Sequence, residues 1–224
     1  MRRIFDIILS GIALLLLLPF LLPLIFILRV TGEGEVFFSQ ERMGKGGSLF
    51  SLYKFATMLK DSPNIGSGTL TVQNDSRILP LGHFLRKTKV NELPQLLNVF
   101  KGDMSIVGPR PQSLRNFSAY SEDIQKKIIL VSPGLTGLGS IFFSNEEAML
   151  TSAISHDEFY DSIIMPYKGQ LEAWYVDHGN IMIDLKIIYA TAIKIIFPTL
   201  RLNLYKLFYG IPNPPKALQG FWRS

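Results

Sequence analysis

The residues best suited to chemistry are Asn91 and Glu92, which begin a segment, 92–101, whose leucines recur with helical spacing. Asparagine is a favoured N-cap, and Pro94 is tolerated in a first helical turn because the backbone donor that it lacks would be unpaired there. The sequence therefore predicts that a helix begins at Asn91. The free N–H groups and the positive end of such a helix attract phosphate.

Charged residues near this predicted helix start suit phosphate and metal binding. The guanidinium groups of Arg86 and Arg110 can each hold phosphoryl oxygens through paired N–H donors. The carboxylate of Glu92 offers hard oxygen atoms, which suit Mg²⁺ bound against a diphosphate. Each residue also has an ordinary structural explanation, as a cap, a partner of the helix dipole or half of a surface ion pair. The pattern as a whole favours an anion-handling site.

A long apolar segment, from Ile4 to Leu28, precedes this site. It is long enough to cross a bilayer as one helix, but Pro19 and Pro23 predict a kink in its middle. Basic residues flank both ends, and the positive-inside tendency would hold both ends on the cytoplasmic face. We therefore favour a re-entrant helix-break-helix over a straight span. A cleavable signal peptide fits poorly, because the segment is too long and lacks a small-residue cleavage site.

The composition limits the classes of function. The 224 residues suffice for one globular domain and a membrane segment, and the net charge of +5 suits anionic lipids or phosphorylated substrates. No helix-turn-helix, zinc-ligand or RNP-like pattern is visible, so we expect no nucleic-acid partner. The absence of cysteine excludes disulfides, thiolate catalysis and cysteine-bound metals.

The periodicity of the remaining sequence predicts a mostly α-helical fold with a short β-hairpin. The hairpin strands are expected over 35–42 and 49–55, joined by a glycine-rich turn that lacks the Ser or Thr of a P-loop after Lys45. An exposed loop is expected over 61–76. Helices are expected over 79–87, 92–101, 121–131, 182–197 and from 145 onwards, with breaks towards Met165-Pro166.

The helix expected over 182–197 has two explanations that the sequence supports equally. Lys186, Lys194 and Arg201 lie in one broad sector, so the helix could rest at a membrane interface with its lysines among head groups. The same pattern fits a core helix with a solvated basic stripe. The predicted organisation is a membrane anchor over 1–30 and a cytoplasmic catalytic domain over 31–224.

Several longer motifs resemble those of the bacterial sugar transferases, the monotopic phosphoglycosyl transferases. They run in order along the chain to about Gly139 and are long enough to make a chance match improbable. They are Phe37-Phe38, Gln40-Glu41-Arg42-Met43-Gly44, Leu52-Tyr53-Lys54-Phe55, Thr57-Met58, Leu85-Arg86-Lys87-Thr88, Glu92-Leu93-Pro94-Gln95-Leu96, Asn98-Val99, Lys101-Gly102-Asp103-Met104-Ser105, Val107-Gly108-Pro109-Arg110-Pro111 and Ser132-Pro133-Gly134-Leu135-Thr136-Gly137.

This resemblance implies a membrane enzyme of the cytoplasmic face of the bacterial inner membrane. Members transfer a sugar phosphate from a UDP-sugar to polyprenyl (undecaprenyl) phosphate and release UMP, which begins the assembly of a polysaccharide or glycoconjugate. In the family's mechanism, the Asp of an Asp-Glu pair before Leu-Pro-Gln attacks the β-phosphate. Mg²⁺, held with help from the Glu, neutralises the diphosphate.

The chain departs from this pattern at Asn91, which stands where the family has its nucleophilic Asp. A carboxamide is neutral and a very poor nucleophile. Three explanations remain open: Glu92 attacks while Asp103 shares the metal, the acceptor phosphate attacks the UDP-sugar directly, or the chain is a silent membrane scaffold or lipid-phosphate-binding homologue. Ala56 also replaces an Arg that is usual in the family, and Leu18 replaces the Ser of a Ser-Pro bend.

The resemblance and the residues together predict a set of site residues and partners. Asn91 and Glu92 are expected at the catalytic centre, with Glu92 and Asp103 as metal ligands for Mg²⁺. Lys54, Arg77, Arg86 and Arg110 are expected to contact substrate phosphates. The expected partners are a UDP-sugar, polyprenyl phosphate and membrane lipids, and the sequence is compatible with a homo-oligomer.

Overall fold

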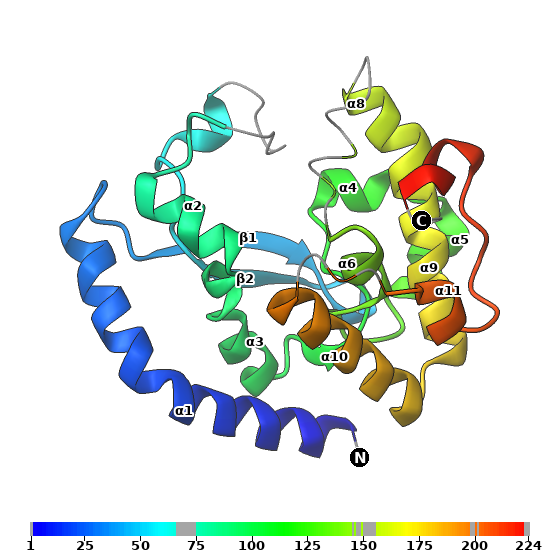
Figure 1. The fold of residues 1–224 in the computed structure, drawn as a ribbon, viewed down its shortest axis with the longest axis horizontal. Helices are drawn as coiled ribbons and strands as arrows, with labels where there is room; N and C mark the ends of the chain where they lie inside the picture. Colours follow the sequence, from blue (N-terminus) through cyan, green and yellow to red (C-terminus); the bar gives the residue numbers. More distant parts are fainter. Residues whose placement is uncertain are drawn as a thin grey trace. The chain divides into compact units, whose positions relative to one another are not determined.

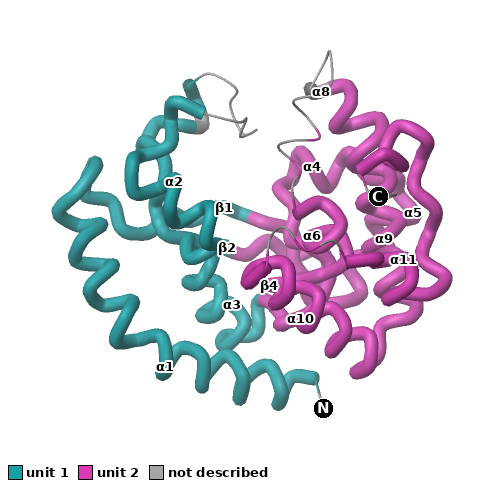
Figure 2. The backbone as a smooth tube through the Cα atoms, in the orientation of Figure 1, with its two compact units in different colours: residues 1–41, 51–103 teal, residues 42–50, 104–224 magenta. Residues whose placement is uncertain are grey.

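A computed structural model describes residues 2–65, 75–144, 146, 149, 156–197, 200 and 202–221. Their fold is mostly helical with two small two-stranded sheets, which confirms the predicted helical class (Figure 1). The chain divides into two compact units, shown in Figure 2. Unit 1 comprises residues 1–41 and 51–103, and unit 2 comprises residues 42–50 and 104–224. The boundary predicted at residue 30 therefore falls inside unit 1.

Unit 1 contains the apolar helix and the segment predicted to do chemistry. The predicted hairpin is present, and its two strands carry the chain between the units. A single 3₁₀ turn over Val90–Glu92, called here the Val90–Glu92 turn, precedes the last helix of the unit. The elements are α1 (Arg2–Val30), β1 (Phe37–Met43), β2 (Leu49–Phe55), α2 (Pro80–Lys87) and α3 (Gln95–Lys101).

Helix α1 is continuous through Pro19 and Pro23, so the predicted interruption at the prolines is absent. Figure 1 shows the helix bending along its length instead. A proline removes one hydrogen bond and kinks a helix without ending it when the surrounding residues favour helix. Among the described residues, α1 is the one helix that is long and apolar enough to cross a membrane, and 6% of its most apolar stretch is buried.

The few buried polar residues of α1 lie where this helix packs on α3. The guanidinium of Arg3 donates to the carbonyl oxygens of Val99 (2.5 Å) and Phe100 (2.7 Å), at the carboxyl end of α3. Asp6 is buried, and the Ser10 hydroxyl donates to its backbone oxygen (2.6 Å). Residues 3, 6 and 10 share one helical face, so these polar residues of α1 face α3, while many of its apolar side chains remain exposed.

Unit 2 is built on a parallel pair of short strands that sequence reasoning did not predict. Ser105 pairs with Gly134 and Val107 with Thr136, and helix α10 packs beside these strands. The backbones approach so closely that a Cβ on Gly134 would lie 2.1 Å from the amide nitrogen of Gly108. The elements are β3 (Ser105–Val107), α4 (Leu114–Ser118), α5 (Glu122–Ile128), β4 (Gly134–Thr136), α6 (Leu138–Phe142), α8 (His156–Phe159), α9 (Met165–His178), α10 (Ile181–Ile196) and α11 (Leu204–Leu207).

Two further predictions differ from the structure. The chain stays helical at Met165-Pro166, where a break was expected, because a π-helical turn over Tyr160–Ile164 leads directly into α9 and places Pro166 in its first turn. The loop expected over 61–76 is described only at its ends, since residues 66–74 lie outside the described part. Ser62 and Asp75 are buried there, not exposed.

Helix α10 confirms the helix predicted over 182–197 but orients its lysines differently from the interfacial prediction. Lys186 donates to the backbone oxygen of Leu207 (3.2 Å), and Lys194 donates to that of Ile141 (2.9 Å). Burial lowers the pKa of Lys194. The exposed face is apolar instead and consists of Ile181, Met182, Leu185, Tyr189, Ile195 and Ile196. Arg201 lies outside the described residues.

Candidate active site

A small hydrophobic cluster in unit 1 brings three predicted site segments together. Phe55, Leu85 and Leu28 form its buried centre, and Val90 packs against them. Each of three cluster members is adjacent in sequence to a predicted site residue: Phe55 follows Lys54, Leu85 precedes Arg86, and Val90 precedes Asn91. Packing of these apolar neighbours therefore sets where the backbone presents the polar side chains.

Arg86 is placed by the close approach of α2 to the segment that follows β2. A Cβ on Gly82 would lie 2.2 Å from the carbonyl oxygen of Thr57, so only glycine allows this contact. The amide of Leu79 donates to the same oxygen (3.0 Å). Arg86 is half-buried in the last turn of α2, where one guanidinium nitrogen lies 3.8 Å from the sulfur of Met58.

Asn91 lies in the Val90–Glu92 turn and not at the start of α3, so the predicted N-cap is wrong. Lys89 adopts a left-handed conformation (φ 60°), and its carbonyl accepts the amide of Glu92 (3.0 Å). The left-handed conformation of Lys89 is followed by the 3₁₀ turn, and α3 begins only at Gln95, after Pro94. A non-glycine residue in this conformation is uncommon and is often found at functional sites.

The side chain of Asn91 is buried, and its Oδ1 atom has no hydrogen-bond partner within the described part of the chain. Leaving a buried acceptor unsatisfied costs about 1–3 kcal/mol. Glu92, the next residue, is half-exposed and carries a carboxylate. A carboxamide oxygen beside a carboxylate suits a hard divalent cation. No group of three or more His, Cys, Asp or Glu is present among the described residues. Mg²⁺ does not require one, because it commonly binds one or two protein ligands together with waters and substrate phosphates.

Asp103 is not brought to Glu92 by the fold. The two residues lie beyond opposite ends of α3, whose seven residues rise about 10 Å. The carboxylate of Asp103 instead accepts a hydrogen bond from the Nδ2 atom of Asn98 (3.1 Å). The predicted sharing of one metal ion by Glu92 and Asp103 therefore has no geometric support.

Asn98 is a buried residue that belongs to the motif Asn98-Val99 but was given no role from the sequence. Its Nδ2 atom also donates to the carbonyl oxygen of Ser51 (2.8 Å), and its Oδ1 atom accepts from the amide of Tyr53 (3.1 Å). The carboxamide thus binds β2 as a neighbouring strand would. It ties α3 to the strand that carries Lys54. The sequence signals were the motif Asn98-Val99 and a polar residue in the apolar run 96–100.

Arg77 is occupied by structural contacts. It is 3% exposed, its Nε and Nη2 atoms donate to the Asp75 carboxylate (2.8 and 2.5 Å), and Nη1 donates to the backbone oxygens of Ser62 and Ile65. The hydrogen bond with Asp75 raises the pKa of Arg77. The guanidinium therefore makes its hydrogen bonds within the loop before α2, whereas the sequence predicted that it would contact a phosphate.

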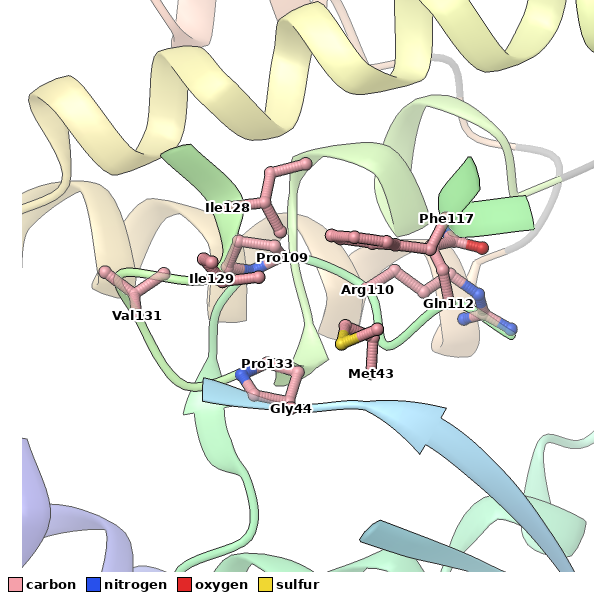
Figure 3. Close-up of a pocket in the computed structure, with 10 residues that line it drawn as sticks. All are labelled: Met43, Gly44, Pro109, Arg110, Gln112, Phe117, Ile128, Ile129, Val131 and Pro133. Carbon is pink, nitrogen blue, oxygen red and sulfur yellow. The ribbon is translucent and has the colours of Figure 1, made fainter. Parts of the chain in front are cut away.

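Arg110 belongs to unit 2, in the loop that follows β3. It is half-buried, and its Nη1 atom lies 3.4 Å from the Ser140 hydroxyl. It also lines a small pocket of about 10 Å³, which has room for about one water molecule (Figure 3). The other lining residues are Met43, Gly44, Pro109, Gln112, Phe117, Ile128, Ile129, Val131 and Pro133.

Glu172, on α9, is the second functional candidate that the sequence analysis missed. It is 1% exposed, and its Oε1 atom accepts the backbone amide of Arg110 (3.1 Å). Burial raises the pKa of Glu172 to about 7, although backbone hydrogen bonds and the charges of Lys168 and Arg110 oppose the shift. A carboxyl group with such a pKa can change its charge near neutral pH.

Comparison with known proteins places this site in a family. The model of the bacterial sugar transferase family matches residues 1–198. The uncharacterized sugar transferase EpsL of Bacillus subtilis is 35% identical over 196 residues, which cover 88% of this chain and 87% of EpsL. The exopolysaccharide production protein PSS of Rhizobium leguminosarum is 34% identical over 203 residues, which cover 87% of this chain and 94% of that protein. The chain therefore belongs to the bacterial sugar transferase family, as the motifs predicted.

A third relative is considerably longer. The undecaprenyl-phosphate galactose phosphotransferase of Salmonella typhimurium is 32% identical over 207 residues, which cover 86% of this chain. The match covers 40% of that protein, so the chain spans about two fifths of its length.

Proposed function

We propose that this protein transfers a sugar phosphate from a UDP-sugar to a polyprenyl phosphate at a membrane surface and releases UMP. The observation that supports the proposal is the cluster of Phe55, Leu85 and Val90, which are the sequence neighbours of Lys54, Arg86 and Asn91. The same unit carries α1, whose exposed apolar surface suits a bilayer. The names of relatives that act on undecaprenyl phosphate support the choice of acceptor.

The residues of this unit have complementary roles in the proposed reaction. Arg86 and Lys54 hold phosphoryl oxygens and offset their charge. Glu92 and the Oδ1 atom of Asn91 are the proposed ligands of Mg²⁺, which when bound neutralises charge on the diphosphate. Arg110, in unit 2, is proposed as a further phosphate ligand.

We propose a single displacement, because Asn91 is neutral and cannot attack phosphorus. An oxygen of the polyprenyl phosphate bonds to the β-phosphorus of the UDP-sugar. The bond from this phosphorus to the bridging oxygen breaks, and that oxygen leaves on UMP. The products are UMP and a polyprenyl diphosphosugar. Asn91 and Glu92 orient the diphosphate in this scheme and form no covalent bond with it.

The second candidate function is a silent membrane scaffold or lipid-phosphate-binding protein. It is favoured by one observation, the carboxamide of Asn91 at the family's nucleophile position. Both candidate functions use the same membrane anchor and the same basic residues. A measurement of UDP-sugar turnover therefore distinguishes them.

The test is incubation of nanodisc-held protein with undecaprenyl phosphate, Mg²⁺ and each of a panel of UDP-sugars, with UMP as the readout. The proposal requires UMP release that depends on both the lipid and Mg²⁺, and that is lost in Glu92→Gln. The matched control is Glu122→Gln, because Glu122 is an exposed residue on α5. Absence of UMP release with every sugar would favour the scaffold, and recovery in Asn91→Asp would show a disabled enzyme.

Intact mass after incubation with the UDP-sugar alone tests the single displacement. The protein mass should stay unchanged. A gain equal to one phosphosugar that is absent in Glu92→Gln would show instead that Glu92 is the nucleophile.

The proposed location is the cytoplasmic face of the bacterial inner membrane, with α1 entering and leaving the same leaflet. The support is the bend of α1, its exposed apolar surface and the basic residues at both of its ends. The apolar face of α10 is a second proposed membrane contact.

A further inference from the structure

Glu172 lies at the carboxyl ends of the two parallel strands of unit 2. Its Oε1 atom accepts the backbone amide of Arg110, in the loop after β3, and the carboxyl group also forms a backbone hydrogen bond with Gly139, in the first turn of α6. A Cβ on Gly139 would lie 2.3 Å from Oε1, so the carboxyl group lies directly against the glycine backbone. One buried side chain of α9 therefore holds the loop after β3 and the start of α6.

We propose that Glu172 is a positioning residue for the Arg110 guanidinium. This inference rests on the proposed function, in which Arg110 contacts a substrate phosphate. The carboxyl group fixes the backbone at Arg110 itself, and the Ser140 hydroxyl next to Gly139 lies 3.4 Å from the Arg110 guanidinium. The loop after β3 and the start of α6 are thus joined through the Glu172 carboxyl group and the Arg110 side chain. Loss of that oxygen releases the backbone from which the guanidinium extends.

The surroundings of Glu172 explain why a carboxylate, and not merely an acceptor, occupies this position. Hydrogen bonds to an ionised acceptor are about twice as strong as neutral ones. The groups that face Glu172 are Arg110 after β3, Lys168 on its own helix and the Tyr120 hydroxyl before α5. Lys168 is in turn bound to Glu146 (2.8 Å). The Oε2 atom of Glu172 has no hydrogen-bond partner among the described residues, so it can carry the proton.

This arrangement predicts how activity depends on pH. Because the pKa of Glu172 lies near 7, the ionised form should predominate only above neutral pH. The hold on Arg110 then tightens as pH rises, and kcat/KM for the UDP-sugar should rise through this range in the natural protein. Substrate phosphates also titrate and contribute to such a profile. The test is therefore the comparison of the pH profile of the natural protein with that of a variant.

The variant that tests the inference is Glu172→Gln, which keeps an oxygen acceptor and removes the charge. We expect kcat/KM to fall by about tenfold at pH 8, mainly through a higher KM for the UDP-sugar, with the rise near pH 7 lost. Glu172→Ala should cost about 100-fold, as expected for a misplaced binding group. Gly139→Ala should resemble Glu172→Gln, because its Cβ displaces the same oxygen. Glu122→Gln is the control and should keep the natural profile.

Hydrogen–deuterium exchange at the Arg110 amide gives a readout that needs no turnover. The amide should be protected in the natural protein and exchange at least tenfold faster in Glu172→Ala, with exchange in β3 unchanged. The inference is overturned if the natural protein is active and both Glu172→Gln and Glu172→Ala keep its KM, its pH profile and its rate of exchange at Arg110. A natural protein without turnover overturns the proposed function instead, and the exchange at Arg110 then decides the positioning role alone.

Discussion

The hydrogen bond between Asn98 and Asp103 separates two roles that Asp103 could have. If Asp103 orients the buried Asn98 carboxamide, it needs only an oxygen acceptor 3.1 Å from Nδ2. Asp103→Asn supplies that oxygen through Oδ1, so stability and activity should stay close to those of the natural protein. Asp103→Ala removes the acceptor and leaves one amide hydrogen of a buried residue unpaired, which costs about 1–3 kcal/mol.

The assays are thermal unfolding in detergent and UMP release over a range of Mg²⁺ concentrations. For a chain of this length, the loss in Asp103→Ala corresponds to a fall in Tm of about 2–4 °C per kcal/mol. The Mg²⁺ concentration for half-maximal rate should be unchanged in both variants. Asn98→Asp should be more damaging than Asp103→Ala, because it sets two carboxylates together and withdraws the donor from the Ser51 carbonyl.

A contrary result would be equally clear. If Asp103→Asn raised the Mg²⁺ requirement at least tenfold without lowering Tm, Asp103 would be a metal ligand and the positioning role of the Asn98–Asp103 pair would be refuted. A ligand carboxylate cannot be replaced by a neutral amide without a loss of metal affinity, whereas a hydrogen-bond acceptor can.

Three further predictions follow from the contacts described. Glu172 has a pKa raised from 4.5 to about 7, so its contribution to stability is present below pH 4.5 and is lost as pH rises through 7. The stability of Glu172→Gln relative to the natural protein should therefore increase by about 3 kcal/mol between pH 4.5 and 8, and a pH-independent difference in Tm would contradict this. Arg3→Gln removes charged donors from the carboxyl end of α3 and should lower Tm by about 2–4 °C, equivalent to about 1 kcal/mol, whereas Lys87→Gln, at an exposed position of α2, is the control. Because the chain has no cysteine, single cysteines at Arg2 and Glu33 can be labelled selectively in sealed inverted vesicles. Both should react from outside if α1 is re-entrant, and protection of one would show a full crossing.

Local sequence patterns were sufficient to predict most of the individual elements. The apolar content of 4–28 predicted α1, and the glycine-rich turn between two β-rich runs predicted the hairpin. The leucine spacing before Gly102 predicted α3, whose end is marked by the left-handed conformation of that glycine (φ 104°). These features depend on neighbouring residues, which is why periodicity reveals them. The motifs likewise predicted the family.

Short strands and buried polar contacts could not be predicted from local patterns. A three-residue strand such as β3 has too little pattern of its own, and its pairing with β4 depends on the close approach of glycine backbones. Arg77 and Asp103 are conventional phosphate or metal candidates from their residue types. The fold instead pairs Arg77 with Asp75 and Asp103 with Asn98.

The sequence by itself determined the membrane-seeking helix, the order of the elements and the chemical types available at the site. It also determined that Asn91 is not a nucleophile, because that conclusion depends on the carboxamide alone. Tertiary structure decided which polar side chains are paired within the fold, as Arg77 is with Asp75. The physical reason is that a buried polar group must find a partner, and that partner comes from whichever segment the packing of the core brings within hydrogen-bond distance.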